Sequence, residues 1–462
     1  MLHLDDTIAA ISTPPGEGGI GVVRLSGPQA LEIAGRLFHP SKPGRLDEVP
    51  SHTLHHGILV YQNQVLDEAL VAVMRAPHSY TRENVVELQV HGSPVVVRQI
   101  LEATLACGAR AAEPGEFTQR AFLNGRLNLD QSQAVLDLIQ AKTQLSAHYA
   151  MDRLEGKFSQ PLKALSERLS DLLAGVGVGM DYPDYEEDAL PRAVLVDGLK
   201  QAVVAVRQVL ARARDGRILR EGYAIAIVGK PNVGKSTLLN ALLNSNRALV
   251  TPVAGTTRDT LEEFVEIRGV PFRLVDTAGL RHSPDEVERL GMQRTRAAVD
   301  RADLVLVVLD LMRPLSREDR DVLEYVGSKP NLVLLNKCDV VEQVVWQKVC
   351  EALSLTPETS LPISAHTGLG LETLKERLVR RVWGGTLPKH ETVFFLDLRE
   401  KDLLQRALKL LQQASQTAAA AGTLDLIAIE VQEALEVLGE LTGESASEAV
   451  IERIFAKFCV GK

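Results

Sequence analysis

A phosphate-binding loop limits the possible fold of this chain more than any other segment. Residues 229–236 read Gly-Lys-Pro-Asn-Val-Gly-Lys-Ser, after an apolar run at 223–228 and before a helix-like run that begins at Thr237. The two glycines of such a loop let successive backbone N–H groups turn toward phosphate oxygens, and the helix N-terminus adds partial positive charge. The order of strand, loop and helix therefore predicts an α/β domain that binds a nucleotide.

The side chains of this loop predict where a triphosphate and its metal ion would be held. The Lys235 ammonium can reach the β- and γ-phosphates, and the Ser236 hydroxyl can ligate Mg²⁺. We expect nucleotide contacts from six consecutive residues, which are Asn232, Val233, Gly234, Lys235, Ser236 and Thr237.

A second motif distinguishes one base from another. Residues 332–339, Leu-Val-Leu-Leu-Asn-Lys-Cys-Asp, read as a buried strand that ends in Asn-Lys-x-Asp. A carboxylate at Asp339 can accept hydrogen bonds from the N1–H and the exocyclic amine of guanine, whereas adenine would leave the acceptor unpaired. We expect Lys337 to lie over the base and Asn336 to brace the loop.

A third motif completes the expected base site. Residues 361–366 read as a short strand that ends in Ser364, Ala365 and His366. A backbone N–H group at this Ser-Ala step could meet the carbonyl oxygen of guanine, which again favours guanine over adenine.

Two segments between these motifs predict contacts near the γ-phosphate. The strand-like run 272–276 ends in Asp276, Thr277, Ala278 and Gly279. Asp276 would act through a Mg²⁺-bound water, the Gly279 N–H would meet the γ-phosphate, and Thr257 could join the Mg²⁺ shell. The residues before Thr257 are also expected to line the nucleotide, and they are Thr251, Pro252, Val253, Ala254, Gly255 and Thr256. Four motifs in this order resemble the Ras-like GTPase domain.

The residue after Gly279 is a departure from that domain. Ras-like enzymes place a glutamine there to orient the attacking water, but this chain has Leu280, whose hydrocarbon side chain cannot hydrogen-bond water. One substitute is the carboxylate of Glu288, although composition alone favours a solvent-facing charge there. Another is a K⁺ ion beside the phosphates, held by Asn232 and the carbonyl-rich segment 251–256, although Asn232 could equally brace its loop.

The whole chain resembles the MnmE (TrmE) family of tRNA-modification GTPases. The resemblance is carried by four stretches besides the nucleotide motifs, at residues 6–27, 87–92, 114–130 and 454–462. It implies that GTP hydrolysis is assisted by K⁺, with Glu288 orienting the water. The implied K⁺ ligands are Asn232, Thr251, Val253 and Thr256.

The resemblance also implies a second ligand and several partners. The N-terminal domain would bind 5-formyl-tetrahydrofolate or a related tetrahydrofolate through Arg24, Glu87, Arg126 and Lys462, although some relatives have lysine at the position of Arg126. Glu87 suits the amino-pyrimidine edge of a pteridine and the cations suit its glutamate tail. A homodimer would join the flavin-dependent MnmG (GidA) in a heterotetramer or larger complex. Together they would place an aminomethyl or carboxymethylaminomethyl group on the wobble uridine of certain tRNAs, using a folate one-carbon unit.

Periodicity along the chain predicts three parts. Residues 1–118 mix β-rich runs and helical stretches, as expected of an α+β domain, and the family resemblance implies that this domain binds a folate and dimerises. Residues 119–216 and 381–462 carry apolar residues at helical spacing and would form one bundle, because a helix with one apolar stripe needs a partner. Residues 217–380 alternate strands and helices. The predicted fold class is therefore multidomain α/β, with an α-helical bundle and an inserted Ras-like P-loop GTPase domain.

Charge and cysteine content constrain the setting of the protein. The formal net charge is −9, so we expect any tRNA contact to use a local basic patch or a basic partner protein. Four scattered cysteines without metal-ligand spacing, together with an N-terminus that lacks a basic signal region, favour a cytoplasmic protein. The apolar runs are too short for a membrane span.

Two other functions remain open at this stage. A regulatory GTPase in the assembly of ribosomes or other RNA particles would carry the same nucleotide motifs. A folate-dependent aminomethyltransferase with a dispensable nucleotide domain would keep full activity after Lys235→Ala.

Overall fold

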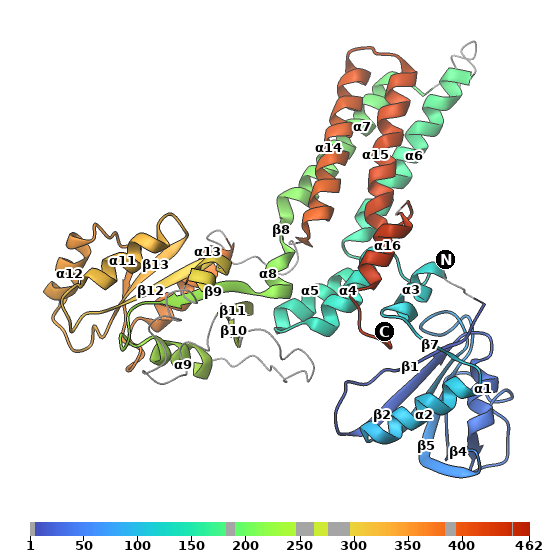
Figure 1. Cartoon of the computed structure of the whole chain (residues 1–462). Helices are drawn as coiled ribbons and strands as arrows, with labels where there is room; N and C mark the ends of the chain where they lie inside the picture. The colour runs from blue at the N-terminus through green and yellow to red at the C-terminus, as the bar shows by residue number, and fades with distance from the viewer. Residues whose placement is uncertain (1–4, 182–189, 246–262, 276–295, 384–393, 446) are drawn as a thin grey trace. The chain divides into compact units, whose positions relative to one another are not determined.

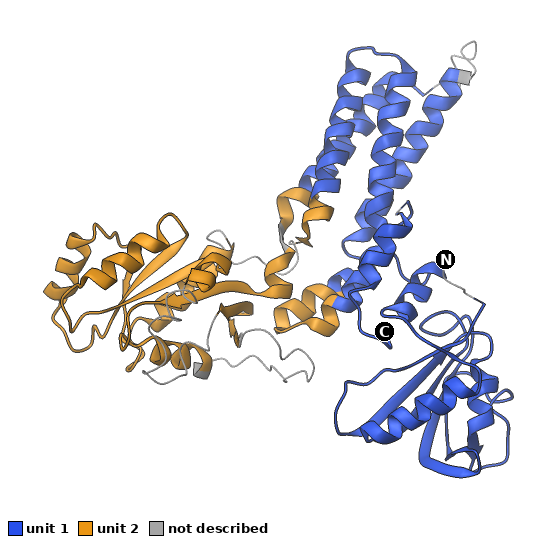
Figure 2. Cartoon of the chain, viewed as in Figure 1, with its two compact units in different colours: residues 1–136, 152–208, 402–462 blue, residues 137–151, 209–401 orange. Residues whose placement is uncertain are grey.

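The computed structural model describes residues 5–181, 190–245, 263–275, 296–383, 394–445 and 447–462 (Figure 1). They form two compact units, coloured separately in Figure 2, with residues 1–136, 152–208 and 402–462 in unit 1 and residues 137–151 and 209–401 in unit 2. Unit 2 is therefore inserted into unit 1 along the chain. The predicted fold class is confirmed, whereas the three-part division with limits at 118, 216 and 380 stays a prediction.

Unit 1 begins with a seven-stranded sheet in the order β3-β4-β5-β6-β2-β1-β7, in which all neighbours are antiparallel except β1 and β7. The strands are β1 Ile8–Ile11, β2 Gly18–Ser26, β3 Phe38–Pro40, β4 Thr53–Tyr61, β5 Gln64–Met74, β6 Val85–Gly92 and β7 Arg110–Ala111. Two helices, α1 (Ala30–Leu37) and α2 (Pro94–Ala106), pack against one face of this sheet.

Side chains alternate between the two faces of the sheet along each strand, so the residues that do not enter the core under α1 and α2 lie on the opposite face. In β2 and β6, Val23, Leu25, Val86 and Leu88 enter the core under α1 and α2. Successive side chains of a strand point to opposite faces, so the polar residues between them face the other side. That face receives α3 (Glu116–Leu123), whose Phe117 packs against β1.

The rest of unit 1 is helical. Its helices pack on apolar stripes, with α6 against α15. The side chain of Arg192 in α7 donates hydrogen bonds to the carbonyl oxygens of Ala418 (2.9 Å) and Gly422 (2.6 Å). These contacts join segments on both sides of the insertion, as the green and red helices of Figure 1 show. The helices, some of which run into unit 2, are α4 Leu129–Gln140, α5 Gln144–Leu154, α6 Ser159–Asp181, α7 Arg192–Arg212, α14 Leu398–Ala419, α15 Leu424–Thr442 and α16 Glu448–Phe455.

Unit 2 is built on a six-stranded sheet in the order β10-β11-β9-β12-β13-β14, parallel except for the β10–β11 pair. The strands are β9 Tyr223–Val228, β10 Glu263–Ile267, β11 Val270–Val275, β12 Leu304–Asp310, β13 Asn331–Asn336 and β14 Ser360–Pro362. Every residue of β12 is buried, as expected of a central parallel strand covered on both faces.

Helices cover both faces of this sheet. Apolar side chains of α9 (Lys235–Ser245) and α13 (Leu371–Trp383) fill one core, and those of α11 (Arg317–Val326) and α12 (Gln343–Ala352) line the other. A short helix, α8 (Gly216–Glu221), and a two-stranded pair of β8 (Ala213–Asp215) and β15 (Phe394–Leu396) complete unit 2. No helix in the described residues is long and apolar enough to cross a membrane.

Candidate functional sites

The phosphate loop joins β9 to α9 at the carboxyl edge of the parallel sheet, where open α/β sheets bind ligands. Gly229 and Gly234 have φ angles of 147° and 101°. A Cβ atom on Gly229 would lie 2.5 Å from the carbonyl oxygen of Val308, and one on Gly234 would lie 2.3 Å from Nδ2 of Asn336. Both positions therefore require glycine, for conformation and for space.

Lys235 is enclosed by the backbone of its own loop. Its Nζ donates to the carbonyl oxygens of Gly229 (2.8 Å) and Lys230 (2.7 Å). Burial lowers the pKa of Lys235 to about 8, because the ammonium is partly desolvated. A phosphate group would supply the negative charge that stabilises this cation, so the site fits a polyphosphate.

Asn336 links the three predicted motifs of the base and phosphate sites. Its buried side chain donates from Nδ2 to the Val233 carbonyl (2.7 Å) and accepts at Oδ1 from the Ala365 N–H (2.9 Å). One amide therefore holds the phosphate loop beside the Ser-Ala step. The arrangement is the one expected of a bracing residue, while its part in guanine binding stays a prediction.

Lys337 has a partner that the sequence motifs do not contain. Its Nζ donates to Oδ2 of Asp310 at 2.7 Å, and the Asp310 side chain is buried. Asp310 ends β12 directly opposite Asn336 of β13. The available signal was an acid closing an otherwise apolar run, and Asp310 emerges as a residue that orients Lys337.

The remaining base-site residues follow β13 and β14. Asp339 and His366 are exposed, whereas Ser364 is buried and its Oγ accepts from the Thr367 N–H at 3.1 Å. The Asp339 carboxylate is thus accessible to a ligand, and the Ser-Ala step is held by its own turn.

A buried ion pair fixes the phosphate loop to α11. Lys230 Nζ donates to Asp319 Oδ2 at 2.7 Å, and Asp319 forms a capping box with Ser316 at the start of that helix. Burial raises the pKa of Asp319, but hydrogen bonds from Lys230 and Ser316 outweigh it, so the pKa lies below its ordinary value. The sequence motifs left this partner unidentified, because Lys230 occupies a variable position of the loop pattern.

Several predicted residues lie outside the described parts of the chain. They are Thr251, Pro252, Val253, Ala254, Gly255, Thr256, Thr257, Asp276, Thr277, Ala278, Gly279 and Glu288. Of the expected Mg²⁺ ligands only Ser236 is described, and of the K⁺ ligands only Asn232. Asn232 is an exposed residue of the phosphate loop, and its backbone φ is 64°. Both side chains offer the hard oxygen that such ions prefer, and their ligand roles stay predictions.

A second candidate site lies in unit 1, on the sheet face that carries α3. Arg24 of β2 and Glu87 of β6 are directly paired in register, and Nε and Nη2 of Arg24 both lie 2.9 Å from Oε1 of Glu87. Oε2 of Glu87 accepts no hydrogen bond from the described residues, so it is open to a second donor. The strand pairing thus presents a carboxylate whose cationic neighbour is already in place.

The segment 459–462 packs against this pair. Arg24 Nη1 donates to the Gly461 carbonyl at 3.4 Å, and Ser12 Oγ donates to the same oxygen at 3.2 Å. Gly461 has φ 95°, and a Cβ there would lie 2.2 Å from the Ile11 carbonyl oxygen. Burial lowers the pKa of Lys462 and Arg24 lowers it further, against the opposing charge of Glu87. Three predicted folate residues therefore lie together.

Arg126, the fourth predicted folate residue, also lies near Arg24, because both arginines contact the ring of Tyr80. The guanidinium carbon of Arg126 lies 4.7 Å from the centre of the Tyr80 ring, that of Arg24 lies 6.0 Å from it, and Thr118 Oγ1 lies 2.9 Å from the Tyr80 hydroxyl. Sequence reasoning missed Tyr80, because no motif marks one tyrosine among the aromatic residues. A flat ring with two cations beside it suits a conjugated, anionic ligand.

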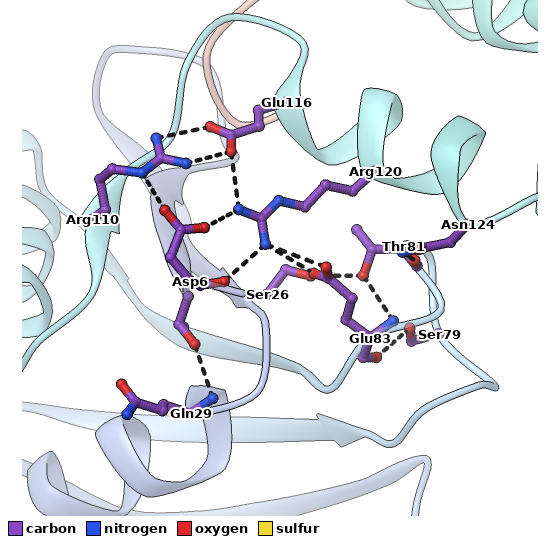
Figure 3. A network of polar contacts seen from close by, with 11 residues as sticks. Asp6, Ser26, Gln29, Ser79, Thr81, Glu83, Arg110, Glu116, Arg120 and Asn124 are labelled. Carbon is purple, nitrogen blue, oxygen red and sulfur yellow. Dashed lines mark hydrogen bonds and ion pairs between the residues drawn. The ribbon is translucent and has the colours of Figure 1, made fainter. Parts of the chain in front are cut away.

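A network of ion pairs around the buried Arg120 and Glu116 holds α3 in position (Figure 3). Arg120 is fully buried and bonds Glu116 (3.0 Å), Glu83 (3.2 Å) and both the carbonyl and the carboxylate of Asp6, while Arg110 bonds Glu116 as well. The same helix carries Phe117 and Thr118, which contact Arg24 and Tyr80. This network, also missed from the sequence, positions the floor of the second site.

The fold and the ordered nucleotide motifs define the class of P-loop GTPases. Two family models match the chain, "GTP-binding protein TrmE N-terminus" over residues 7–126 and "MnmE helical domain" over residues 129–459. The chain belongs to the MnmE (TrmE) family of tRNA modification GTPases, and the predicted family and enzyme class are thereby confirmed.

Curated relatives match over nearly their whole length. Proteins named tRNA modification GTPase MnmE are 43% identical in Geobacillus kaustophilus, over 99% of both chains, and 43% identical in Lacticaseibacillus paracasei, over 99% of this chain and 98% of that one. The one from Carboxydothermus hydrogenoformans is 42% identical over 99% of this chain and all of its own. A solved structure of Aquifex aeolicus Era bound to GDP·AlF4⁻ is 26% identical and covers 40% of this chain and 66% of that one, with a TM-score of 0.27.

Proposed function

We propose that this chain hydrolyses GTP with the help of K⁺ while it takes part in modifying the wobble uridine of tRNA. One observation carries the proposal: a single chain holds a phosphate loop braced by Asn336 to the Ser-Ala step and, in its other unit, a carboxylate paired with an arginine, which is the chemistry that a pteridine would need. Family membership supports the coarser function of a GTPase in tRNA modification.

At the nucleotide site, this chain's own residues orient the ligand. Backbone N–H groups and Lys235 would hold the phosphates, Asp339 would accept from guanine, and Glu288 would orient water. Ser236 and Thr257 would hold Mg²⁺, and Asn232, Thr251, Val253 and Thr256 would hold K⁺. These ions would offset negative charge that builds on the phosphates, as an arginine would in related enzymes.

At the second site, we propose a reduced folate such as 5-formyl-tetrahydrofolate. Glu87 Oε2 would accept from the amino-pyrimidine edge, Arg24 would hold the Glu87 carboxylate in place through its ion pair, and Arg126 and Lys462 would meet the glutamate carboxylates. The partners we propose are a second copy of the chain, MnmG (GidA) and tRNA. Four free cysteines support a cytoplasmic setting.

Mass analysis of wobble uridine tests the biological function. Cells lacking the protein should lose the modified base, and an added copy should restore it. Unchanged tRNA, together with co-sedimentation of the protein with ribosomal subunits, would instead support a regulatory GTPase of particle assembly.

Two purified-protein experiments test the chemistry. GTP turnover should fall sharply when K⁺ is replaced by Na⁺, and Glu288→Ala should abolish it while leaving GTP affinity in place. Equal turnover in both salts would remove K⁺ from the proposal, and an active Glu288→Ala enzyme would remove the role of that carboxylate.

A further inference from the structure

A surface hollow of about 570 Å³ adjoins the second site, and apart from Tyr80 and Arg126 its lining residues have no part in the function described so far. Tyr80 and Arg126 line it, and they are the residues that connect it to Arg24 and Glu87. Its other basic lining residues are His52, His78 and Arg82, all of them exposed. The hollow is therefore a continuation of the second site toward solvent.

The charge of the hollow is one-sided. Among the described residues that line it there is no carboxylate. Arg82 Nη1 donates to the Asn124 carbonyl at 2.8 Å and Arg126 Nη1 to the Tyr80 carbonyl at 2.9 Å, so both guanidinium groups bond neutral oxygens. The nearby acid Glu83 turns toward Arg120 instead (Figure 3). Two arginines without acidic partners in the described structure form a site for anions.

Two of the lining residues also have strained backbone. His52 and Arg82 have φ angles of 62° and 60°, which are uncommon for residues other than glycine. Their side chains are nevertheless held, His52 by Ser51 Oγ at 2.8 Å and Arg82 by the Asn124 carbonyl. Backbone strain that the surrounding contacts maintain is typical of ligand sites.

We propose that this hollow binds the γ-linked glutamate chain of a polyglutamylated folate. The inference rests on the proposed folate site and extends it. A ligand with its pteridine at Glu87 would place its first glutamate at Arg126, and Arg126 also lines the hollow. Each further γ-linked glutamate adds one carboxylate, and Arg82, Arg126 and the two imidazoles face that chain. The open shape suits a flexible, solvated polyanion.

The test compares ligands that differ only in their tails. Dissociation constants of the full-length protein for 5-formyl-tetrahydrofolate with one and with five glutamates should differ by about five- to tenfold at low ionic strength, because each exposed ion pair adds only a few-fold. Added salt should shrink the difference, since exposed charges are screened. Equal affinity for the two ligands would overturn the inference while leaving the folate site intact.

Substitutions at Arg82 test whether this residue accounts for the higher affinity for the long glutamate tail. Arg82→Gln can still hydrogen-bond the Asn124 carbonyl but lacks charge, and it should lose most of the preference for the long tail with unchanged binding of the monoglutamate. Arg82→Lys keeps the charge and should keep most of the preference. Arg98→Gln removes an exposed arginine of α2 in the same unit and should behave as the parent protein.

Other outcomes separate this inference from the function on which it rests. If neither folate binds, the proposed folate site and the tail site both fail. If Arg82→Gln weakens tRNA binding and leaves the tail preference unchanged, the hollow serves RNA phosphates and the inference is overturned. If Arg82→Gln weakens both folates equally, Arg82 supports the folate site as a whole and the hollow has no separate role.

Discussion

The two candidate sites are assembled in different ways. In unit 2, the residues belong to short motifs that follow adjacent parallel strands, so each motif carries its geometry within a few residues. In unit 1, Arg24 meets the carbonyl of Gly461 across 437 positions of sequence, and a turn and a helix between them supply Tyr80 and Thr118. A site made of local motifs tolerates changes elsewhere in the chain, whereas a site made of distant segments depends on the whole unit.

Lys235→Ala should give the largest separation of the two sites. Loss of the enclosed ammonium removes charge stabilisation at the transferred phosphate, and we expect GTP turnover to fall by about a hundredfold or more. Folate affinity of the same variant should be unchanged, because Lys235 belongs to unit 2. Turnover assays and folate titration on one preparation measure both. Full tRNA-modifying activity in this variant would favour the aminomethyltransferase reading.

Asn336→Ala should test whether the local motifs depend on one another. The change leaves the Val233 carbonyl and the Ala365 N–H without a partner, at a cost of about 2–4 kcal/mol in the free energy of unfolding of unit 2. Denaturant unfolding with a probe in unit 2 measures it. Asn331→Ala, at the other end of β13, loses a partly buried bond to the Lys329 carbonyl and should cost less. Equal costs would mean that Asn336 is not a special link.

Gly461→Ala should disrupt the second site, which is formed by segments distant in sequence, and should leave the nucleotide site unchanged. A Cβ there would overlap the Ile11 carbonyl oxygen, so the segment 459–462 should shift away from Arg24. We expect folate affinity to fall by about tenfold, roughly 1.4 kcal/mol, with GTP turnover unchanged. Gly108→Ala has a similar φ of 114° but open space around the Cβ, and should leave folate affinity unchanged. Isothermal titration of both variants decides the point.

A pH titration should give the smallest and most specific effect. The pKa of Lys235 is lowered to about 8 in the free protein, and a bound phosphate should raise it. Below about pH 8 the ammonium is already charged and GTP affinity should be flat, whereas above it binding must take up a proton and affinity should fall by up to about tenfold per pH unit. Calorimetry in buffers of different ionisation enthalpy should detect up to about one proton taken up near pH 9. No uptake at that pH would contradict the enclosed state of Lys235.

The lowered pKa of Lys235 should affect the stability of the free protein in the opposite direction from GTP affinity: as pH rises, affinity should fall and stability should increase. Because the folded pKa of Lys235 lies below the ordinary value of 10.5, the unfolded chain binds more protons between about pH 8 and 10.5. The contribution of Lys235 to stability should therefore increase as pH rises through that window.

The same contrast explains how much could be predicted from sequence. The fold class and the placement of the nucleotide motifs followed from short patterns, because strand, loop and helix each have local signals. Asp310 and Asp319 were missed, since their partners Lys337 and Lys230 reach them only after the sheet has formed. For the second site, Arg24, Glu87, Arg126 and Lys462 came from family resemblance. Tyr80, Arg82 and the Arg120 network carry no local signal, and only the tertiary structure brings them together.

The packing of segment 459–462 against Arg24 has a consequence for synthesis on the ribosome. Unit 2 has all its residues once position 401 has been translated, whereas the second site waits for Gly461 and Lys462. If the second site binds a folate as proposed, a nascent or prematurely stopped chain should bind GTP before it can hold a pteridine. Occupancy of that site would report that translation had passed position 461.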